Sequence, residues 1–206
     1  ADDVTGTATV SLQVQDDGGT ANGGADTSPV QTFVITVNAV NDAPSVTLVG
    51  DQSVDEDAGA QSVPGFASGF DAGGGSDEDG QAVADYLVSN DNPGLFAVVP
   101  DVANDGTLSY TPADDVTGTA TVSLQVQDDG GTANGGADTS PVQTFTVTVN
   151  AVNDAPSFVI AGDQSVDEDA GAQSVPGFAS GFAPGGGSDE DGQAVADYLV
   201  SNDNPG

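Results

Sequence analysis

Acidic side chains recur in short clusters, and they are the residues whose types and spacing could do chemistry. Within one repeat the clusters are Asn41-Asp42, the triplet Asp55–Asp57, the triplet Asp77–Asp79 and the pair Asp16-Asp17, with Asp26 nearby. Carboxylates crowded into one region repel one another unless a cation neutralises them. Ca²⁺ takes six to eight oxygens from carboxylates, amides and backbone carbonyls. The clusters therefore favour a calcium-binding site. The hairpin loop supplies Asp16 and Asp17 as candidate ligands, and its second copy supplies Asp128 and Asp129.

The overall charge strengthens this interpretation. Among 206 residues there are 33 acids and no Lys, Arg or His, which gives a net charge of −33. No ion pair between side chains is possible, and self-repulsion opposes the compact state, so cations are the expected partners. Nucleic acid and anionic membranes are not, because both attract basic residues. The alternative is that many of these acids only form a solvated surface.

The stretch "NAVNDAPS" occurs at 38–45 and again at 150–157. Its Asn and Asp supply an amide oxygen and a carboxylate side by side, and the proline two residues later restricts the backbone. We expect this stretch to be a hinge that a metal ion stiffens. The alternative is that Asn-Asp-Ala-Pro is only a turn.

Several other chemistries are excluded by residue type. The loop Asp77–Gly80 lacks the later ligands of an EF-hand, and Ser76 interrupts the glycine pattern of the calcium-binding nonapeptide repeat. Asp71 is replaced by Ala183 in the next copy, so we do not expect it to be a ligand. There is no Cys for a disulfide or thiolate site. Without His, Cys, Lys or Arg only a carboxylate pair could catalyse a reaction, and we expect no enzyme.

A repeat of 112 residues organises the chain. Residue n matches residue n+112 at all but eight of the 94 overlapping positions, the differences being 34, 35, 46–49, 71 and 72. The period fits one whole domain per repeat. Division at the two prolines predicts a C-terminal half-domain at 1–43, a complete domain at 44–155 and an N-terminal half-domain at 156–206, as in a piece of a longer tandem array.

The pattern of the complete domain is all-β. In "TATVSLQVQ" the apolar residues Ala120, Val122, Leu124 and Val126 alternate with polar ones, which is typical of a strand with one buried face. Phe145, Val147 and Val149 do the same in "TFTVTV". Turn signals separate seven predicted strands, and this spacing favours a Greek-key sandwich. The predicted strands are 45–50, 60–70, 82–89, 95–99, 107–111, 118–127 and 142–150.

Several motifs together resemble a known family. "FTVTVNAVNDAPS", "DQSVDEDAG", "SDEDGQ" and "GTLSYTPADDVTGTATVSLQVQDDGG" resemble the cadherin-like, Ig-like tandem extender repeats of RTX adhesins from marine Gram-negative bacteria. The resemblance covers the whole chain. It implies Ig/cadherin-like sandwiches of about seven strands, joined end to end, with Ca²⁺ at the junctions. Carried onto matching positions, it implies metal ligands at Asn41, Asp42, Glu56, Asp77, Asp79, Asn153, Asp154, Glu168, Asp189 and Asp191.

The resemblance implies a function as well. We expect a calcium-rigidified spacer on the extracellular surface of a Gram-negative bacterium, which projects a distal ligand-binding region and contacts only calcium and the neighbouring repeats, without membrane contact. Two alternatives remain open: a calcium-independent acidic spacer, and an Ig-like module that binds a ligand through its loops. The half-domains could also pair head to tail between molecules by strand complementation.

Overall fold

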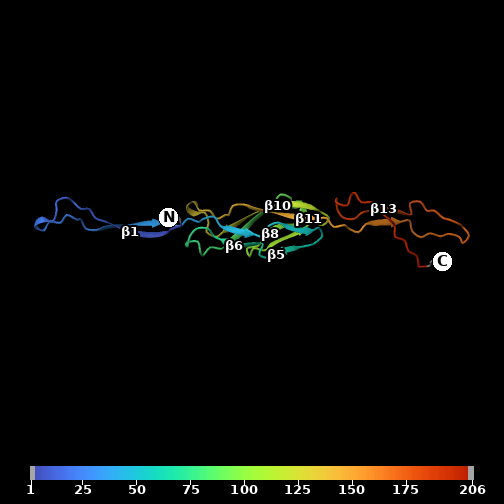
Figure 1. Cartoon of the computed structure of the whole chain (residues 1–206), viewed down its shortest axis with the longest axis horizontal. Coiled ribbons are helices and arrows are strands. Elements are labelled where there is room, and N and C mark those ends of the chain that lie inside the picture. The colour runs from blue at the N-terminus through green and yellow to red at the C-terminus, as the bar shows by residue number, and fades with distance from the viewer. Residues whose placement is uncertain (1–2, 204–206) are drawn as a thin grey trace. The chain divides into compact units, whose positions relative to one another are not determined.

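The computed structural model describes residues 3–203, and these residues form an all-β protein. They contain 13 strands and three short 3₁₀ helices, η1 (Ala21–Gly23), η2 (Pro93–Leu95) and η3 (Ala133–Gly135). The first strands, β1 (Gly6–Leu12) and β2 (Gln31–Val37), pair antiparallel in a hairpin (Figure 1). Alternating apolar and β-branched residues favour such extended pairing.

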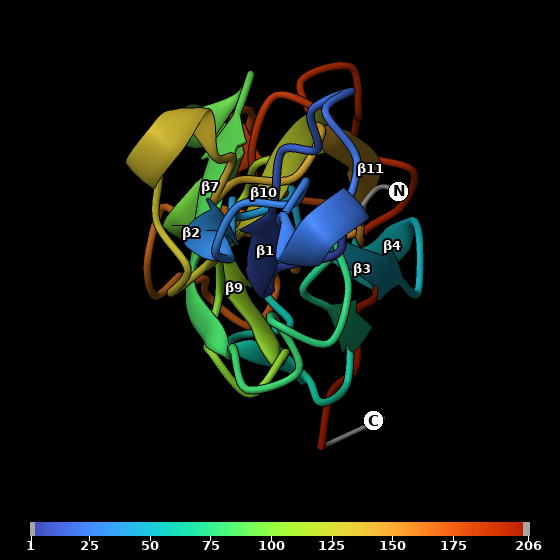
Figure 2. The ribbon, with the colours of Figure 1, turned by 90° about the vertical axis from the view of Figure 1, so that its left-hand side faces the viewer.

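Nine strands lie between residues 44 and 155, and they form three sheets. One sheet has the order β4-β11-β10-β7, a second pairs β3 with β6, and a third has the order β5-β9-β8. Of these strands, Figure 2 labels β3, β4, β7, β9, β10 and β11. This arrangement is consistent with a β-sandwich. The strands are β3 (Ser45–Leu48), β4 (Gln52–Asp55), β5 (Gln61–Val63), β6 (Ala67–Asp71), β7 (Val83–Asn90), β8 (Phe96–Val102), β9 (Leu108–Pro112), β10 (Gly118–Asp128) and β11 (Gln143–Asn150).

The predicted strands agree with these except around residues 50–70. The structure adds β4, and it divides the predicted strand 60–70 into β5 and β6. The division occurs at the turn Pro64-Gly65, where Gly65 has φ +69° and the chain cannot stay extended. The final hairpin pairs β12 (Ser157–Ile160) with β13 (Ala179–Ala183).

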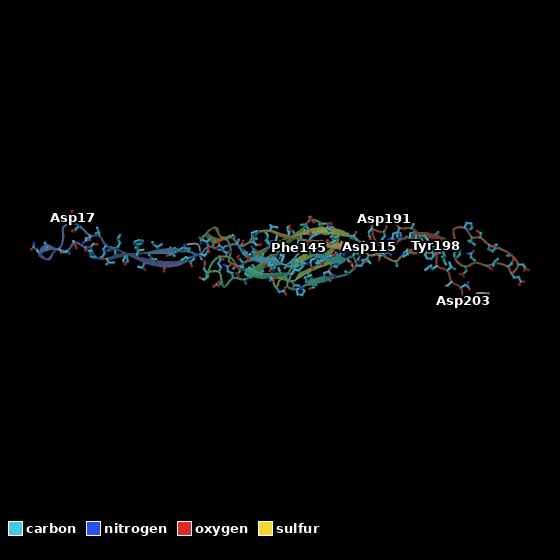
Figure 3. All side chains as sticks on the ribbon, in the orientation of Figure 1. Asp17, Asp115, Phe145, Asp191, Tyr198 and Asp203 are labelled. Atoms are coloured by element: carbon cyan, nitrogen blue, oxygen red, sulfur yellow. The ribbon has the colours of Figure 1, made fainter. Side chains whose placement is uncertain are left out.

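The buried apolar side chains of the described residues all lie between Pro44 and Val149. As the alternation predicts, the apolar faces of β10 and β11 are inside, with Val122 and Val147 fully buried. Phe145, labelled in Figure 3, packs against Phe66 with ring centroids 4.6 Å apart. Tyr86 and Tyr110 are also buried, as expected of core aromatics.

Contacts divide the chain into two compact units, each made of several segments. One contains residues up to Leu48 with Ala67–Leu87 and Gln125–Val142, and the other contains Val49–Phe66, Val88–Leu124 and the residues from Gln143 onward. This division by contacts does not test the boundaries predicted from the repeat, which stay a prediction. The ends of the predicted half-domains, residues 1–2 and 204–206, lie outside the described residues.

Candidate metal centre

Three carboxylates converge at the second linker. One oxygen each of Asp57, Asp115 and Asp154 lies within 4.8 Å of the other two. Asp57 follows β4, Asp115 follows β9, and Asp154 follows β11, and all three belong to the second contact unit (Figure 3 labels Asp115). Like charges this close oppose one another in the absence of a cation.

Strand register explains how residues so distant in sequence meet. β4 runs parallel beside β11, and Asp55 is the partner of Asn150 at their common end. The turn after β4 and the linker after β11 therefore begin side by side. Asp57 and Asp115 both have left-handed backbones, with φ of 60° and 56°. Among non-glycine residues Asp tolerates this conformation comparatively well, because its short side chain can hydrogen-bond locally.

Two buried glutamates hold the linker backbone beside these carboxylates. The Val152 N–H donates to Glu56 Oε1 over 2.7 Å, and the Asp154 N–H donates to Glu190 Oε1 over 2.5 Å. Glu56 is 2% exposed and Glu190 is 1% exposed. In each glutamate Oε2 is buried without a hydrogen-bond partner, as is Oδ2 of Asp154. Buried carboxylate oxygens without a partner are costly, and a bound cation would satisfy these atoms.

The crowding changes the acidity of the cluster. The Val152 N–H lowers the pKa of Glu56, but burial and the charges of Asp189, Asp57 and Asp154 outweigh it and raise the pKa. Partial desolvation raises the pKa of Asp115, and the charges of Asp154 and Asp57 raise it further. Because Asp115 is exposed as a residue, its neighbours' charges are the more important cause. Both pKa values are thus raised, which means that the protonated, neutral forms of Glu56 and Asp115 are favoured over their charged forms.

The donor set fits a hard cation. All the converging atoms are oxygens, mostly carboxylate, and such sites suit Ca²⁺ or Mg²⁺, whereas zinc prefers thiolate and imidazole. Ligands that come from three loops suit Ca²⁺ better than Mg²⁺, because Ca²⁺ accepts flexible geometry with more ligands. Within residues 3–203 no other group of three such side chains converges as closely.

The first linker repeats part of this arrangement inside the first contact unit. The Asp42 N–H donates to Glu78 Oε1 over 2.6 Å, as Asp154 does to Glu190. Glu78 is 3% exposed, and its Oε2 has no partner. Gly74 has φ +36°, and a Cβ there would lie 2.5 Å from Glu78 Oε2, so only glycine leaves room for the glutamate. The repeated sequence therefore forms the same hydrogen bond, from the linker Asp N–H to a buried glutamate, at both linkers.

Asn41 and the loop after β10 form a separate polar group. Asn41 Nδ2 donates to Asp128 Oδ1 over 3.1 Å, and Asn41 Oδ1 accepts from Gln81 Nε2 over 2.7 Å. A small cavity of about 120 Å³ lies here, with Asp77 in its wall. Asp129 Oδ1 instead accepts from the Ala82 N–H over 3.0 Å and fixes the loop to the backbone.

The remaining predicted ligands lie outside the convergent triad. Asn153 Oδ1 accepts from Gln193 Nε2 over 2.9 Å. Asp189 is exposed but close enough to Glu56 to affect its pKa. Five others are exposed, and for them metal binding stays a prediction; they are Asp16, Asp17, Asp79, Glu168 and Asp191.

Five participants were not among the predicted ligands. Asp57 lies in a recognised acidic triplet, but Asp115 gives no local signal apart from following Asp114. Glu78 and Glu190 could have been found, because every Glu of the chain stands inside an Asp-Glu-Asp triplet. Gln81 follows the four residues "DEDG", and its side-chain amide donates to Asn41 Oδ1.

An apolar hollow of about 1040 Å³ opens among residues 153–201, with Phe178 and Tyr198 in its wall. The copies of these residues one repeat earlier, Phe66 and Tyr86, are 0% and 5% exposed in the core. The hollow is therefore lined in part by residues whose copies one repeat earlier belong to the core.

Neither protein-family models nor curated protein sequences match this chain. Among the described residues no helix has the length and apolar character needed to cross a membrane.

Proposed function

We propose that this chain is a spacer segment of a large bacterial cell-surface adhesin, and that Ca²⁺ bound at the linkers stiffens it. Its domains would be Greek-key, Ig/cadherin-like sandwiches of the kind that the sequence resembles, and the adhesin would project a distal binding region into the extracellular space. The observation that carries the proposal is the convergence of Asp57, Asp115 and Asp154, in a chain without a single basic side chain.

The mechanism follows from the origin of the three carboxylates. Asp57 and Asp115 belong to turns at the end of one predicted domain, whereas Asp154 belongs to the linker that leaves it. A cation bound by all three would tie the linker to that domain. Glu56 and Glu190 would keep the linker backbone in place while their free oxygens face the positive charge. Without the cation, repulsion favours separation of these segments.

The size of the effect can be estimated. Sites in extracellular modules bind Ca²⁺ with dissociation constants of about 10⁻⁴–10⁻³ M. At about 10 mM Ca²⁺ each such site contributes roughly 1.4–2.7 kcal/mol to stability. A domain is stable by only about 5–15 kcal/mol, so one or two sites are a substantial part of it.

Calcium-dependent melting of point variants tests the proposal. Asp115→Asn should lose most of the gain in Tm between EDTA and 10 mM CaCl₂, because it removes one converging carboxylate. Asp114→Asn removes the same charge from an exposed neighbour outside the triad, and it should keep the gain. Equal calcium responses in both variants and the parent would refute the site.

The alternative of a calcium-independent acidic spacer makes the opposite prediction. Charge screening alone would let NaCl at matched ionic strength stabilise the chain as much as CaCl₂. Small-angle X-ray scattering then tests the mechanical part, since we expect EDTA to broaden the distribution of end-to-end distances. Unchanged scattering together with unchanged melting would refute the calcium mechanism and leave the two alternatives, the acidic spacer and the ligand-binding module.

A further inference from the structure

The half-buried side chain of Asn41 is hydrogen-bonded to the loop that follows β10. Its Nδ2 donates to the Ala137 carbonyl over 2.7 Å and to Asp128 Oδ1 over 3.1 Å, while its Oδ1 accepts from Gln81 Nε2. The backbone joins as well, because the Ala137 N–H donates to the Asn41 carbonyl over 2.8 Å. Four hydrogen bonds thus fasten one linker residue to the loop 128–137 and to Gln81.

Glycines make the room that Asn41 occupies. A Cβ on Gly130 would collide with Asn41 Oδ1, and a Cβ on Gly136 would lie 2.9 Å from the Asn41 backbone nitrogen. Asn134 helps to turn the loop between them, since it has φ 58° inside η3. The glycine-rich stretch "DDGGTANGGAD" is therefore shaped to accept a linker residue.

We propose that Asn41 is a metal-independent lock, which fixes the linker to the repeat that follows it. Every bond of the lock joins an amide or backbone N–H to an oxygen, so none requires a cation. This gives Asn41 a positioning role different from that of the predicted metal ligand. The bond to Asp128 Oδ1 also satisfies one oxygen of a buried carboxylate, which is 3% exposed and whose Oδ2 has no hydrogen-bond partner.

The lock makes the joint between repeats asymmetric. Asp42 in the first linker and Asp154 in the second are equivalent positions of the repeat. At the second linker the convergent triad brings Asp154 together with two residues of the preceding repeat. A linker would thus be held by the lock to the repeat that follows it and by the triad to the repeat before it. Removal of the cation should therefore loosen the linker on the side of the preceding repeat only. This second half rests on the proposed function, whereas the lock itself does not.

Hydrogen exchange of single amides, followed by NMR on the 206-residue chain, separates the two halves. The Ala137 amide reports the lock, and the Val152 amide reports the Glu56 contact beside the triad. On transfer from 5 mM CaCl₂ to EDTA, we expect Ala137 exchange to change less than twofold and Val152 exchange to accelerate at least tenfold. Free exchange of Ala137 in EDTA, with protection in CaCl₂, would overturn the metal-independent lock.

Variants test the residue assignment. In EDTA, Asn41→Ala should accelerate Ala137 exchange at least tenfold, and Gly136→Ala should do the same by closing the space. Asn153→Ala is the matched control, because Asn153 Oδ1 also accepts from a glutamine, Gln193, but its Nδ2 donates to the adjacent Asp154 carbonyl. Amides of β10 and β11 must stay protected in all variants, which shows that the core is folded.

Each result decides one of the two ideas. Unchanged Ala137 exchange in Asn41→Ala, with the core folded, would refute the lock. If the exchange rate of Val152 does not change with calcium while that of Ala137 rises in Asn41→Ala, the lock is supported and the proposed calcium site is refuted.

Discussion

Truncation of Phe145 to alanine tests where the core of this chain lies. Phe145 is 3% exposed in β11 and packs against Phe66 with ring centroids 4.6 Å apart. Its copy one repeat earlier, Phe33, follows the same residues and has the same strand register, opposite Val10 as Phe145 is opposite Val122, although the two residues after it are Val34 and Ile35 in place of Thr146 and Val147. Phe33 is nevertheless 51% exposed. The two phenylalanines therefore differ mainly in burial.

The magnitude follows from this burial. A buried aromatic side chain removes about 150–250 Å² from water, which at about 25 cal/mol per Å² gives roughly 4–6 kcal/mol. Alanine keeps part of that contact, and measured truncations of buried Phe cost about 3–5 kcal/mol. For a domain of this size, such a loss lowers Tm by roughly 15 °C or more. Phe33→Ala should stay within about 0.5 kcal/mol of the parent.

Thermal unfolding followed by circular dichroism in 10 mM CaCl₂ measures both variants. We expect a large fall in Tm for Phe145→Ala and almost none for Phe33→Ala. Equal losses in the two variants would contradict the reasoning, because they would mean that the hairpin β1–β2 is packed as tightly as β10–β11. Urea unfolding gives the free energies directly and checks that both variants keep the slope of the parent.

Three further predictions concern polar groups. The pKa values of Glu56 and Asp115 are raised, so the folded metal-free state binds more protons than the unfolded state. The free energy of unfolding in EDTA should therefore rise as the pH falls from 7 toward about 5. A fall in this free energy, measured by calorimetry, would contradict the prediction. Ser140→Ala leaves the buried Val126 N–H without its acceptor, Ser140 Oγ at 3.0 Å, and should lower the free energy of unfolding, measured in urea, by on the order of 1–3 kcal/mol. Ser28→Ala breaks the equivalent bond in the exposed hairpin and should lower it less, because water replaces the lost acceptor. Gly186→Ala places a Cβ 2.6 Å from Asp154 Oδ2 and should weaken the calcium response of Tm, while Gly192→Ala, with open space at its Cβ, should not.

Local patterns predicted the strands well where the two faces differ. The alternation in β10 and β11 identified both the strands and the buried side chains, because a period of two fixes which residues share a face. The sequence "DQSVDED" carries β4 but shows little apolar alternation, so it gave no strand signal. β4 forms because β11 offers a parallel edge, which is a long-range property.

The sequence predicted the type of metal site but not which residues form it. Charge and clustering indicated oxygen ligands for a cation, yet Asp57, Asp115 and Asp154 are 58 and 39 positions apart. The pairing of β4 with β11 brings Asp57 near Asp154, and Asp115 comes from the turn after β9, in a different sheet. Glu56 and Glu168 stand in identical sequences, but only Glu56 is buried. Burial there depends on the strands around it, and no local rule distinguishes the two copies.

A crystal structure of the chain grown in millimolar CaCl₂ tests the central claim most directly. The account predicts an ion between Asp57, Asp115 and Asp154, with oxygen distances of about 2.3–2.6 Å. Well-ordered carboxylates in these positions with only water among them would contradict it.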